Sequence, residues 1–159
     1  MNIEIIGFRE ELAVHFTELN LAWLKKYFVV EPIDHEVLSD PKRLIIDKGG
    51  FIFFATADKK IAGTFALIKT GSDEYELSKM AVDEDFQGRK IGNCMLDFCI
   101  EEVKKLRAAK LILYSNTQLK PAVHLYKKYG FTEVPLNSSE YQRSNIKMEI
   151  NFKHYNEPD

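Results

Sequence analysis

The amino-acid sequence predicts a mixed α/β fold, and three observations carry this prediction. Strand-like segments rich in β-branched and aromatic residues gather in the middle of the chain, between residues 51 and 82. Apolar residues at helical spacing come before and after them. No Pro-, Gly- or Ser-rich linker divides the 159 residues, whose number is typical of one domain. We therefore expect residues 1–159 to form a single α/β domain.

The first part of the chain predicts one strand followed by two helices. Residues 2–8 are apolar and β-branched enough for an opening strand. The next helix is indicated by a stripe of apolar residues at helical spacing: Leu12, Phe16, Leu19, Trp23 and Tyr27. A second helical region follows Pro32, with Asp34 and Asp40 as candidate N-caps, because their side-chain oxygens accept hydrogen bonds from free backbone amides.

The centre of the chain predicts a hairpin and a third strand. Residues 51–55 and 61–68 flank the turn signal at 57–60, which is typical of an antiparallel hairpin. Residues 75–82 alternate polar with apolar side chains, as a half-buried strand does.

The last part of the chain predicts two helices and three strands. Residues 91–107 place apolar side chains on one helical face and charged side chains on the other. A second helix begins at Pro121 and ends before Gly130, which suits a left-handed cap. The three strands are expected at 111–114, 131–134 and 146–152.

Charge and hydropathy exclude several classes of partner. A formal net charge of −2 provides no basic field for nucleic acid or anionic lipid. The N-terminal residues lack the basic flank and apolar core of a secretory signal. No apolar run approaches the roughly 18 residues that span a bilayer. We therefore expect a cytoplasmic protein that binds neither nucleic acid nor membrane.

Residues 82–93 carry the most informative motif, a strand that feeds a glycine-containing turn and then a helix. Free amides at a helix start and the positive end of the helix dipole bind anions, and Arg89 and Lys90 add formal charge. A mononucleotide P-loop would need Lys-Ser or Lys-Thr at this point, and a dinucleotide fingerprint would need a third glycine. An ordinary strand-to-helix turn is the alternative interpretation.

This motif resembles the pyrophosphate loop of the GNAT N-acetyltransferases, in which Gln or Arg is followed by Gly or Ala five residues later. Gln87 and Gly92 match that pattern, whereas Lys90 occupies the central glycine position. Asn116 and the segment 121–131 are similar to a second segment of the same family. The resemblance implies a mostly antiparallel sheet of about seven strands flanked by about four helices.

The resemblance also implies roles in binding acetyl-CoA as cosubstrate. Asn116 would contact the cofactor arm, and Tyr126 would face the sulfur and protonate the departing thiolate. Packing within its helical stripe is the alternative for Tyr126. The strand residues that would pair with the pantetheine or the acetyl carbonyl are Met80, Ala81 and Val82. The residues whose backbone amides would hold the pyrophosphate are Gln87, Gly88, Arg89, Lys90, Ile91, Gly92 and Asn93.

Acetyl transfer requires a neutral amine, and a general base supplies it. Glu76, on the strand before the acetyl-binding segment, is the candidate base, acting directly or through a water. A solvated strand acid is the alternative for Glu76. Glu31 and Asp34, in the connection that borders the acceptor site in this family, are weaker candidates for binding a cationic amine.

The four histidines and two cysteines lack the spacing of a metal site, so we expect no metal. The sequence thus predicts an acetyl-CoA-dependent N-acetyltransferase that acts on a small-molecule or peptide amine by direct attack in a ternary complex. A non-catalytic acyl-CoA-binding regulatory domain of the same fold is the alternative. The resemblance implies a homodimer, and the sequence does not identify the amine.

Overall fold

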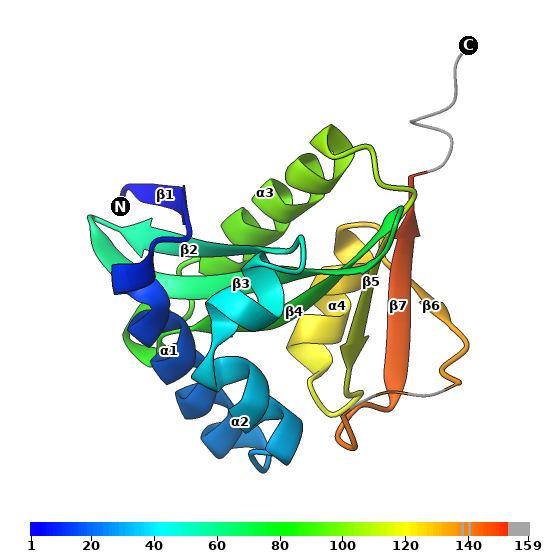
Figure 1. Ribbon diagram of the computed structural model, residues 1–159, viewed down its shortest axis with the longest axis horizontal. Helices are drawn as coiled ribbons and strands as arrows, with labels where there is room; N and C mark the ends of the chain where they lie inside the picture. The colour runs from blue at the N-terminus through cyan, green and yellow to red at the C-terminus, as the bar shows by residue number, and fades with distance from the viewer. Residues whose placement is uncertain (138, 140, 153–159) are drawn as a thin grey trace.

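The computed structural model describes residues 1–137, 139 and 141–152, and these contain one seven-stranded sheet with the order β1-β2-β3-β4-β5-β7-β6 (Figure 1). The strands are β1 (Ile3–Gly7), β2 (Phe51–Ala57), β3 (Lys60–Gly71), β4 (Glu74–Val82), β5 (Lys110–Ser115), β6 (Thr132–Val134) and β7 (Ile146–Asn151). Neighbouring strands are antiparallel except β4 and β5, which are parallel. The predicted mixed, mostly antiparallel sheet is confirmed.

Four α-helices within the described residues cover the two faces of this sheet (Figure 1). They are α1 (Ala13–Tyr27), α2 (Pro32–Ser39), α3 (Ile91–Lys105) and α4 (Lys120–Lys128). One core cluster joins α1 and α2 to one face, with Phe16 and Phe54 at its centre. The other joins α3 and α4 to the opposite face, around Phe65 and Met95. The helices predicted from apolar periodicity are therefore present, and α1 and α3 bury large apolar side chains against the sheet.

The buried face of α1 differs from the predicted stripe. Phe16, Asn20 and Leu24 are the buried residues of this helix, whereas Trp23 is half-buried and Tyr27 is 42% exposed. The predicted stripe followed apolar residues alone, so it missed a polar residue on the sheet-facing side. Trp23 and Tyr27 instead line a cleft described below.

The start of α2 also differs from the prediction. Glu31 is the N-cap, and Asp34 is the third helical residue, whose carboxylate accepts the Glu31 amide at 2.9 Å. The two side chains close a capping box, because each accepts the backbone amide of the other residue. Asp40 does accept the Arg43 amide at 3.3 Å, at the start of a short π-helical turn over Lys42–Ile46.

Strands β4 and β5 form a fork. They pair only at Glu74, Tyr75 and Glu76, and β4 then continues to Val82 without a partner on the β5 side. A bulge in the β3–β4 pairing bends β4 at the same place, and Lys79 takes a left-handed backbone with φ of 55°. The unpaired backbone edge of β4 therefore opens into the space between the two strands.

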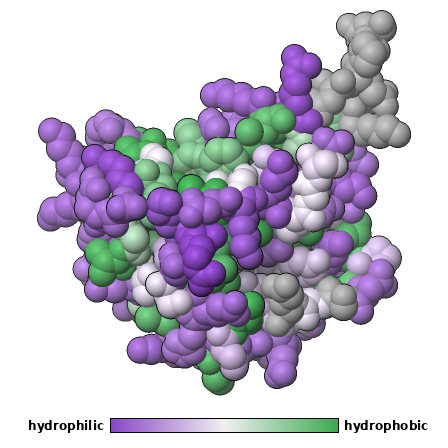
Figure 2. Space-filling model, in the orientation of Figure 1, coloured by the Kyte–Doolittle hydropathy of each residue, from purple (hydrophilic) through white to green (hydrophobic). Residues whose placement is uncertain are grey.

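Figure 2 shows that hydrophilic residues cover most of the face seen there and that hydrophobic residues reach the surface in patches between them. No helix in the described part of the chain combines the length and the hydrophobicity that a membrane crossing requires.

Candidate active site

A cleft of about 630 Å³ occupies the fork between β4 and β5. Its floor is β4 from Glu76 to Val82, and β5 borders it from Leu113 to Ser115, followed by Asn116. The side walls come from α1, from the turn that precedes α3, and from α4. Tyr141, Arg143 and Ser144, which precede β7, complete the lining. The cleft thus collects residues from six separate parts of the chain.

The turn before α3 has the geometry of an anion site. The first bond of the helix runs from the Cys94 amide to the Lys90 carbonyl at 3.1 Å, so the amides of Ile91, Gly92 and Asn93 have no intrahelical acceptor. The positive end of the α3 dipole adds to their attraction for a negative group. Gly92 and Asn93 also line the cleft.

Lys90 stands where the family pattern has a glycine, and its backbone is left-handed, with φ of 62° and ψ of 25°. Glycine adopts this conformation at no steric cost, whereas an L-residue pays about 1 kcal/mol or more. The turn therefore keeps the backbone shape that the glycine would give. Lys90 also lines the cleft, where its ammonium adds positive charge.

Arg89 is the one member of the predicted loop that does not line the cleft. Its Nη1 lies 3.9 Å from the Met1 sulfur, and its guanidinium lies 5.8 Å from the centre of the Phe86 ring. Phe86 itself lines the cleft, so Arg89 lies beside the lining without being part of it. The charge expected from the Arg89 side chain at the anion site stays a prediction. Gln87, Gly88 and Ile91 do line the cleft.

Glu76 lies at the root of the fork, where it pairs with Ile112 in the last step of the β4–β5 ladder. Its side chain is half-buried and lines the cleft. Met80, Ala81 and Val82 line the cleft farther along the unpaired part of β4. The predicted base and the predicted acetyl-binding strand therefore lie on one continuous wall.

Tyr126 lies on α4 and faces the cleft from the side opposite α1. Its ring meets the Phe131 ring edge-on, with centroids 5.9 Å apart, and its hydroxyl bonds to no residue in the described part of the chain. Burial raises the pKa of Tyr126 to about 12, because desolvation disfavours the phenolate. At neutral pH the hydroxyl is therefore protonated and able to donate a hydrogen bond into the cleft.

Asn116 lines the cleft, but its polar atoms already have partners in the protein. Its Nδ2 donates to the Arg143 carbonyl at 2.7 Å, and its Oδ1 accepts the Gln118 amide at 2.8 Å. The side chain thus ties the end of β5 to the segment before β7.

A buried ionic cluster, which sequence reasoning missed, closes the end of the cleft near α2. The Lys79 Nζ donates to the Asp34 Oδ1 at 2.9 Å and to the Tyr141 hydroxyl at 3.0 Å. Arg143 holds the Asp34 carboxylate through two bonds of 2.8 and 2.9 Å and also binds Glu31 at 2.9 Å. The Tyr141 ring lies 4.4 Å from both cationic groups.

This cluster changes the roles expected for Glu31 and Asp34. Burial by itself raises the pKa of Asp34, but the hydrogen bonds from Arg143 and Lys79 outweigh it and lower the pKa to about 2. The carboxylate is therefore ionised at neutral pH and is bound by cations of the chain itself. The expectation that Glu31 and Asp34 bind a cationic amine is not supported, because Lys79 and Arg143 stand between them and the cleft.

The amino-acid sequence contains no local pattern that indicates this ionic cluster. Asp34 and Lys79 are 45 residues apart, and Asp34 and Arg143 are 109 residues apart. The side chain of Lys79 is 3% exposed, although lysine is among the residues least often buried. The bulge in β4 turns it toward α2, and no local pattern in residues 75–82 indicates that bulge.

Known proteins are similar to this chain in sequence and in fold. A family model described as "Acetyltransferase (GNAT) domain" matches residues 48–133. A [ribosomal protein bS18]-alanine N-acetyltransferase of Salmonella typhimurium is 34% identical over 86 residues, which are 54% of this chain and 57% of that protein. The uncharacterized N-acetyltransferase YvbK of Bacillus subtilis is 31% identical over 64% of this chain and 67% of its own length. The chain thus spans little more than half the length of the Salmonella relative.

Solved structures of acetyltransferases have a similar fold. A GNAT-family acetyltransferase from Staphylococcus aureus has a TM-score of 0.82 at 23% identity, over 94% of this chain and 99% of its own. The PaiA N-acetyltransferase of Thermoplasma acidophilum was solved in complex with coenzyme A. It has a TM-score of 0.74 at 22% identity, over 95% of this chain and 99% of its own. These likenesses establish the fold, and the family model covers more than half of the sequence. The chain belongs to the GNAT acetyltransferase family.

Proposed function

We propose that this protein is an N-acetyltransferase that moves the acetyl group of acetyl-CoA directly to a primary amine in a ternary complex. The observation that carries the proposal is the fork, in which an anion-binding helix start, an unpaired strand edge and an unbonded phenol line one cleft. Each of these three features suits a different part of a thioester of coenzyme A.

The cosubstrate is assigned to the wall formed by β4, the turn and α3. The amides of Ile91, Gly92 and Asn93 are suited to the pyrophosphate, and Lys90 supplies a positive charge beside them. The open edge of β4 at Met80, Ala81 and Val82 offers backbone groups to an extended amide-containing arm. We assign Asn116 to holding the Arg143 segment beside this arm.

The chemical step needs three functions from the chain. The neutral amine attacks the thioester carbonyl, and a backbone N–H of β4 stabilises the developing oxyanion. The carbon–sulfur bond breaks, and Tyr126 donates its hydroxyl proton toward the leaving sulfur. Glu76, directly or through a water, takes a proton from the ammonium form of the acceptor and so supplies the neutral amine, and the proton that the nitrogen loses after attack replaces the one that Tyr126 gave to the sulfur. The products are an acetamide and free coenzyme A, and no covalent enzyme intermediate is needed.

The acceptor is assigned to the side of the cleft bounded by α1 and the ionic cluster. The Salmonella and Bacillus relatives are named as N-acetyltransferases, and the Salmonella protein is named for alanine of ribosomal protein bS18. A peptide with a free amino terminus is therefore a sensible acceptor to test first. Small primary amines are the second class, because the cleft is large enough for either.

Turnover tests the proposal most simply. The purified chain is incubated with acetyl-CoA and, in separate reactions, with an alanine-initiated peptide, n-butylamine and spermidine, and released thiol is measured. We expect thiol release that depends on an amine and is matched by acetylated product. Binding of acetyl-CoA without transfer to any amine would favour a non-catalytic acyl-CoA-binding domain instead.

A further inference from the structure

Asn20 is a buried polar residue on the face of α1 that packs against the sheet. It is 3% exposed and lies one helical turn from Phe16 on one side and from Leu24 on the other. Its Nδ2 donates to the Phe16 carbonyl at 2.9 Å. Because only the nitrogen end of the amide can donate to a carbonyl, this bond fixes the direction of the side chain.

The other end of the amide is an acceptor without a donor. The Asn20 Oδ1 accepts no hydrogen bond from any residue in the described ranges. Every side-chain nitrogen or oxygen that is sealed from solvent in those ranges does have a partner. The Oδ1 therefore keeps an opening, and Asn20 lines the cleft in the fork. The free carbonyl is aimed into the candidate active site.

In the protein alone, solvent in the cleft is the donor open to this oxygen, because the Oδ1 is not sealed. Its helix neighbours Phe16 and Leu24 are apolar and fully packed. An apolar residue at this position would pack better against the sheet. A polar residue on an apolar helix face, with its acceptor open to the cleft, is explained most simply by a ligand that supplies the donor.

The position of Asn20 indicates which ligand supplies it. Helix α1 packs against β4, and Asn20 lines the same cleft as Glu76 and Ser78. The residues assigned to acetyl-CoA lie on β4, on the turn before α3 and at the end of β5. Asn20 therefore belongs to the part of the cleft lining that is not assigned to acetyl-CoA and that remains for the acceptor.

We propose that the Asn20 Oδ1 accepts a hydrogen bond from the amine nitrogen of the acceptor, an inference that rests on the proposed function. A neutral primary amine has two N–H groups and one lone pair. One N–H bonds to Asn20, the other to Glu76 or its water, and the lone pair faces the thioester carbonyl. A neutral secondary amine has a single N–H and fails to satisfy both. Asn20 therefore orients the nucleophile and selects primary over secondary amines.

Asn20→Leu tests this with a side chain of similar size that lacks both polar ends. We expect kcat/KM for n-butylamine to fall at least about tenfold, which corresponds to one hydrogen bond of about 1.4 kcal/mol. The preference for n-butylamine over N-methylbutylamine shrinks as well. The Kd for acetyl-CoA stays within about twofold, and the melting temperature stays equal or rises, because an apolar side chain replaces a polar one on the apolar face of α1.

Thr17→Val is the matched control on the same helix. The Thr17 hydroxyl donates to the Leu38 carbonyl at 2.8 Å and does not line the cleft. Loss of the hydroxyl removes the partner of a part-buried carbonyl, so this variant melts at a lower temperature with unchanged kcat/KM. The two substitutions are expected to show opposite patterns.

Two results would overturn the inference. One is an Asn20→Leu protein with undiminished kcat/KM and amine preference. The other is an Asn20→Leu protein that melts several degrees lower, which would make the side chain a structural element. If the unmodified chain acetylates no amine, the proposed function fails on its own, and the melting comparison still decides whether Asn20 is structural.

Discussion

Glu76 lies opposite Ile112 in the last pair of the parallel ladder between β4 and β5. The two strands separate immediately beyond this pair, and the cleft forms in the gap. The candidate base is therefore fixed by the sheet on one side, while the β4 edge toward Val82 is open for a ligand. The paired part of β4 holds the candidate base rigidly, and the unpaired part leaves backbone groups open to a ligand. A catalytic site needs both features.

Glu76→Gln removes the candidate base while keeping a side chain of the same shape. We expect kcat/KM for the amine to fall about 100-fold near neutral pH, with unchanged acetyl-CoA affinity. The loss shrinks as pH rises toward the pKa of the amine, since more of the acceptor is already neutral. A rate profile over pH 6–10 measures this. Glu74→Gln, on the same strand but outside the cleft, serves as the control.

Tyr126→Phe removes the hydroxyl that donates toward the sulfur. The expected result is a fall in kcat of about 10- to 100-fold with little change in KM for acetyl-CoA. Because burial raises the pKa of Tyr126 to about 12, its ionisation produces no fall in rate below about pH 10. Tyr75→Phe, a buried tyrosine outside the cleft, is the control for loss of a hydroxyl. Unchanged kcat in Tyr126→Phe would remove the acid from the mechanism.

Lys90→Gly separates backbone strain from charge in the anion site. Glycine relieves the left-handed backbone and raises the free energy of unfolding by up to about 1 kcal/mol. Acetyl-CoA binds about tenfold more weakly and with less dependence on salt, because one charged partner is lost. Calorimetric titration at two salt concentrations measures both effects.

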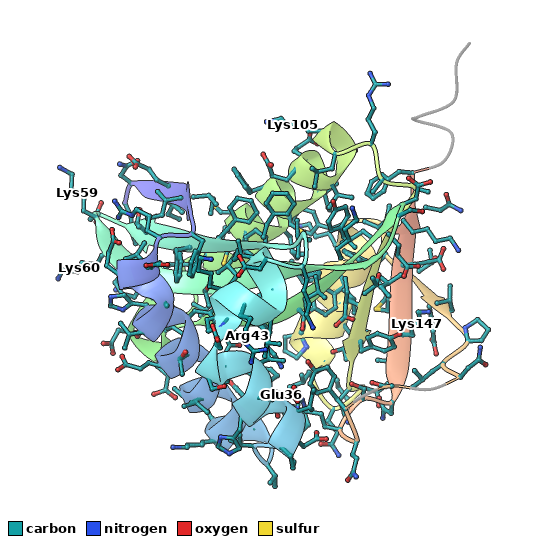
Figure 3. All side chains as sticks on the ribbon, in the orientation of Figure 1. Glu36, Arg43, Lys59, Lys60, Lys105 and Lys147 are labelled. Atoms are coloured by element: carbon teal, nitrogen blue, oxygen red, sulfur yellow. The ribbon has the colours of Figure 1, made fainter. Side chains whose placement is uncertain are left out.

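Lys59→Gly is the control for Lys90→Gly. Lys59 has a φ of 71° in the turn between β2 and β3, at the edge of the molecule (Figure 3). We expect the same gain in stability and no change in affinity. Equal affinity in both variants would show that the Lys90 side chain does not reach the cosubstrate.

The ionic cluster makes the free energy of unfolding depend on pH in the acidic range. The pKa of Asp34 is lowered to about 2 from 3.8, so its contribution is complete above about pH 3.8 and is lost as pH falls to about 2. Asp34→Asn lowers the free energy of unfolding by about 3 kcal/mol at pH 7, because Lys79 and Arg143 lose a buried partner.

The free energies of unfolding of Asp34→Asn and of the unmodified chain become more similar at low pH. Urea unfolding at pH 7 and pH 2.5 measures both. Asp47→Asn, which removes a partner from an exposed ion pair with Lys42, is expected to leave stability nearly unchanged. A loss of stability in Asp34→Asn that stays the same at both values of pH would contradict the assigned ionisation.

Local patterns predicted most of the fold. The alternation in residues 75–82 and the apolar stripe in residues 91–107 correspond to β4 and α3, because both signals arise between near neighbours in sequence. The turn between β4 and α3 was also predictable, since a strand, a glycine-containing turn and a helix are consecutive in the sequence. The resemblance to the family extended these local signals to the whole sheet.

Contacts between distant segments were not predictable in the same way. Arg143 and Asp34 meet only because the segment before β7 lies against α2 in the folded chain. Asn20 did leave a signal, as a polar residue one turn from Phe16 and Leu24, but an apolar stripe through Leu19 and Trp23 fits the sequence as well. Only packing against β4 distinguishes the two faces of α1.

Calorimetric titration of the purified chain with acetyl-CoA tests the central claim most directly. We predict saturable binding of one molecule per chain, and a rise of about 2.7 kcal/mol in the free energy of unfolding at a ligand concentration 100 times the Kd. A thioester that lacks the pyrophosphate half, such as S-acetylpantetheine, binds much more weakly, because the helix start of α3 has no anion to hold. Absence of binding, or equal binding of the two thioesters, would contradict the assignment of the fork as the acetyl-CoA site.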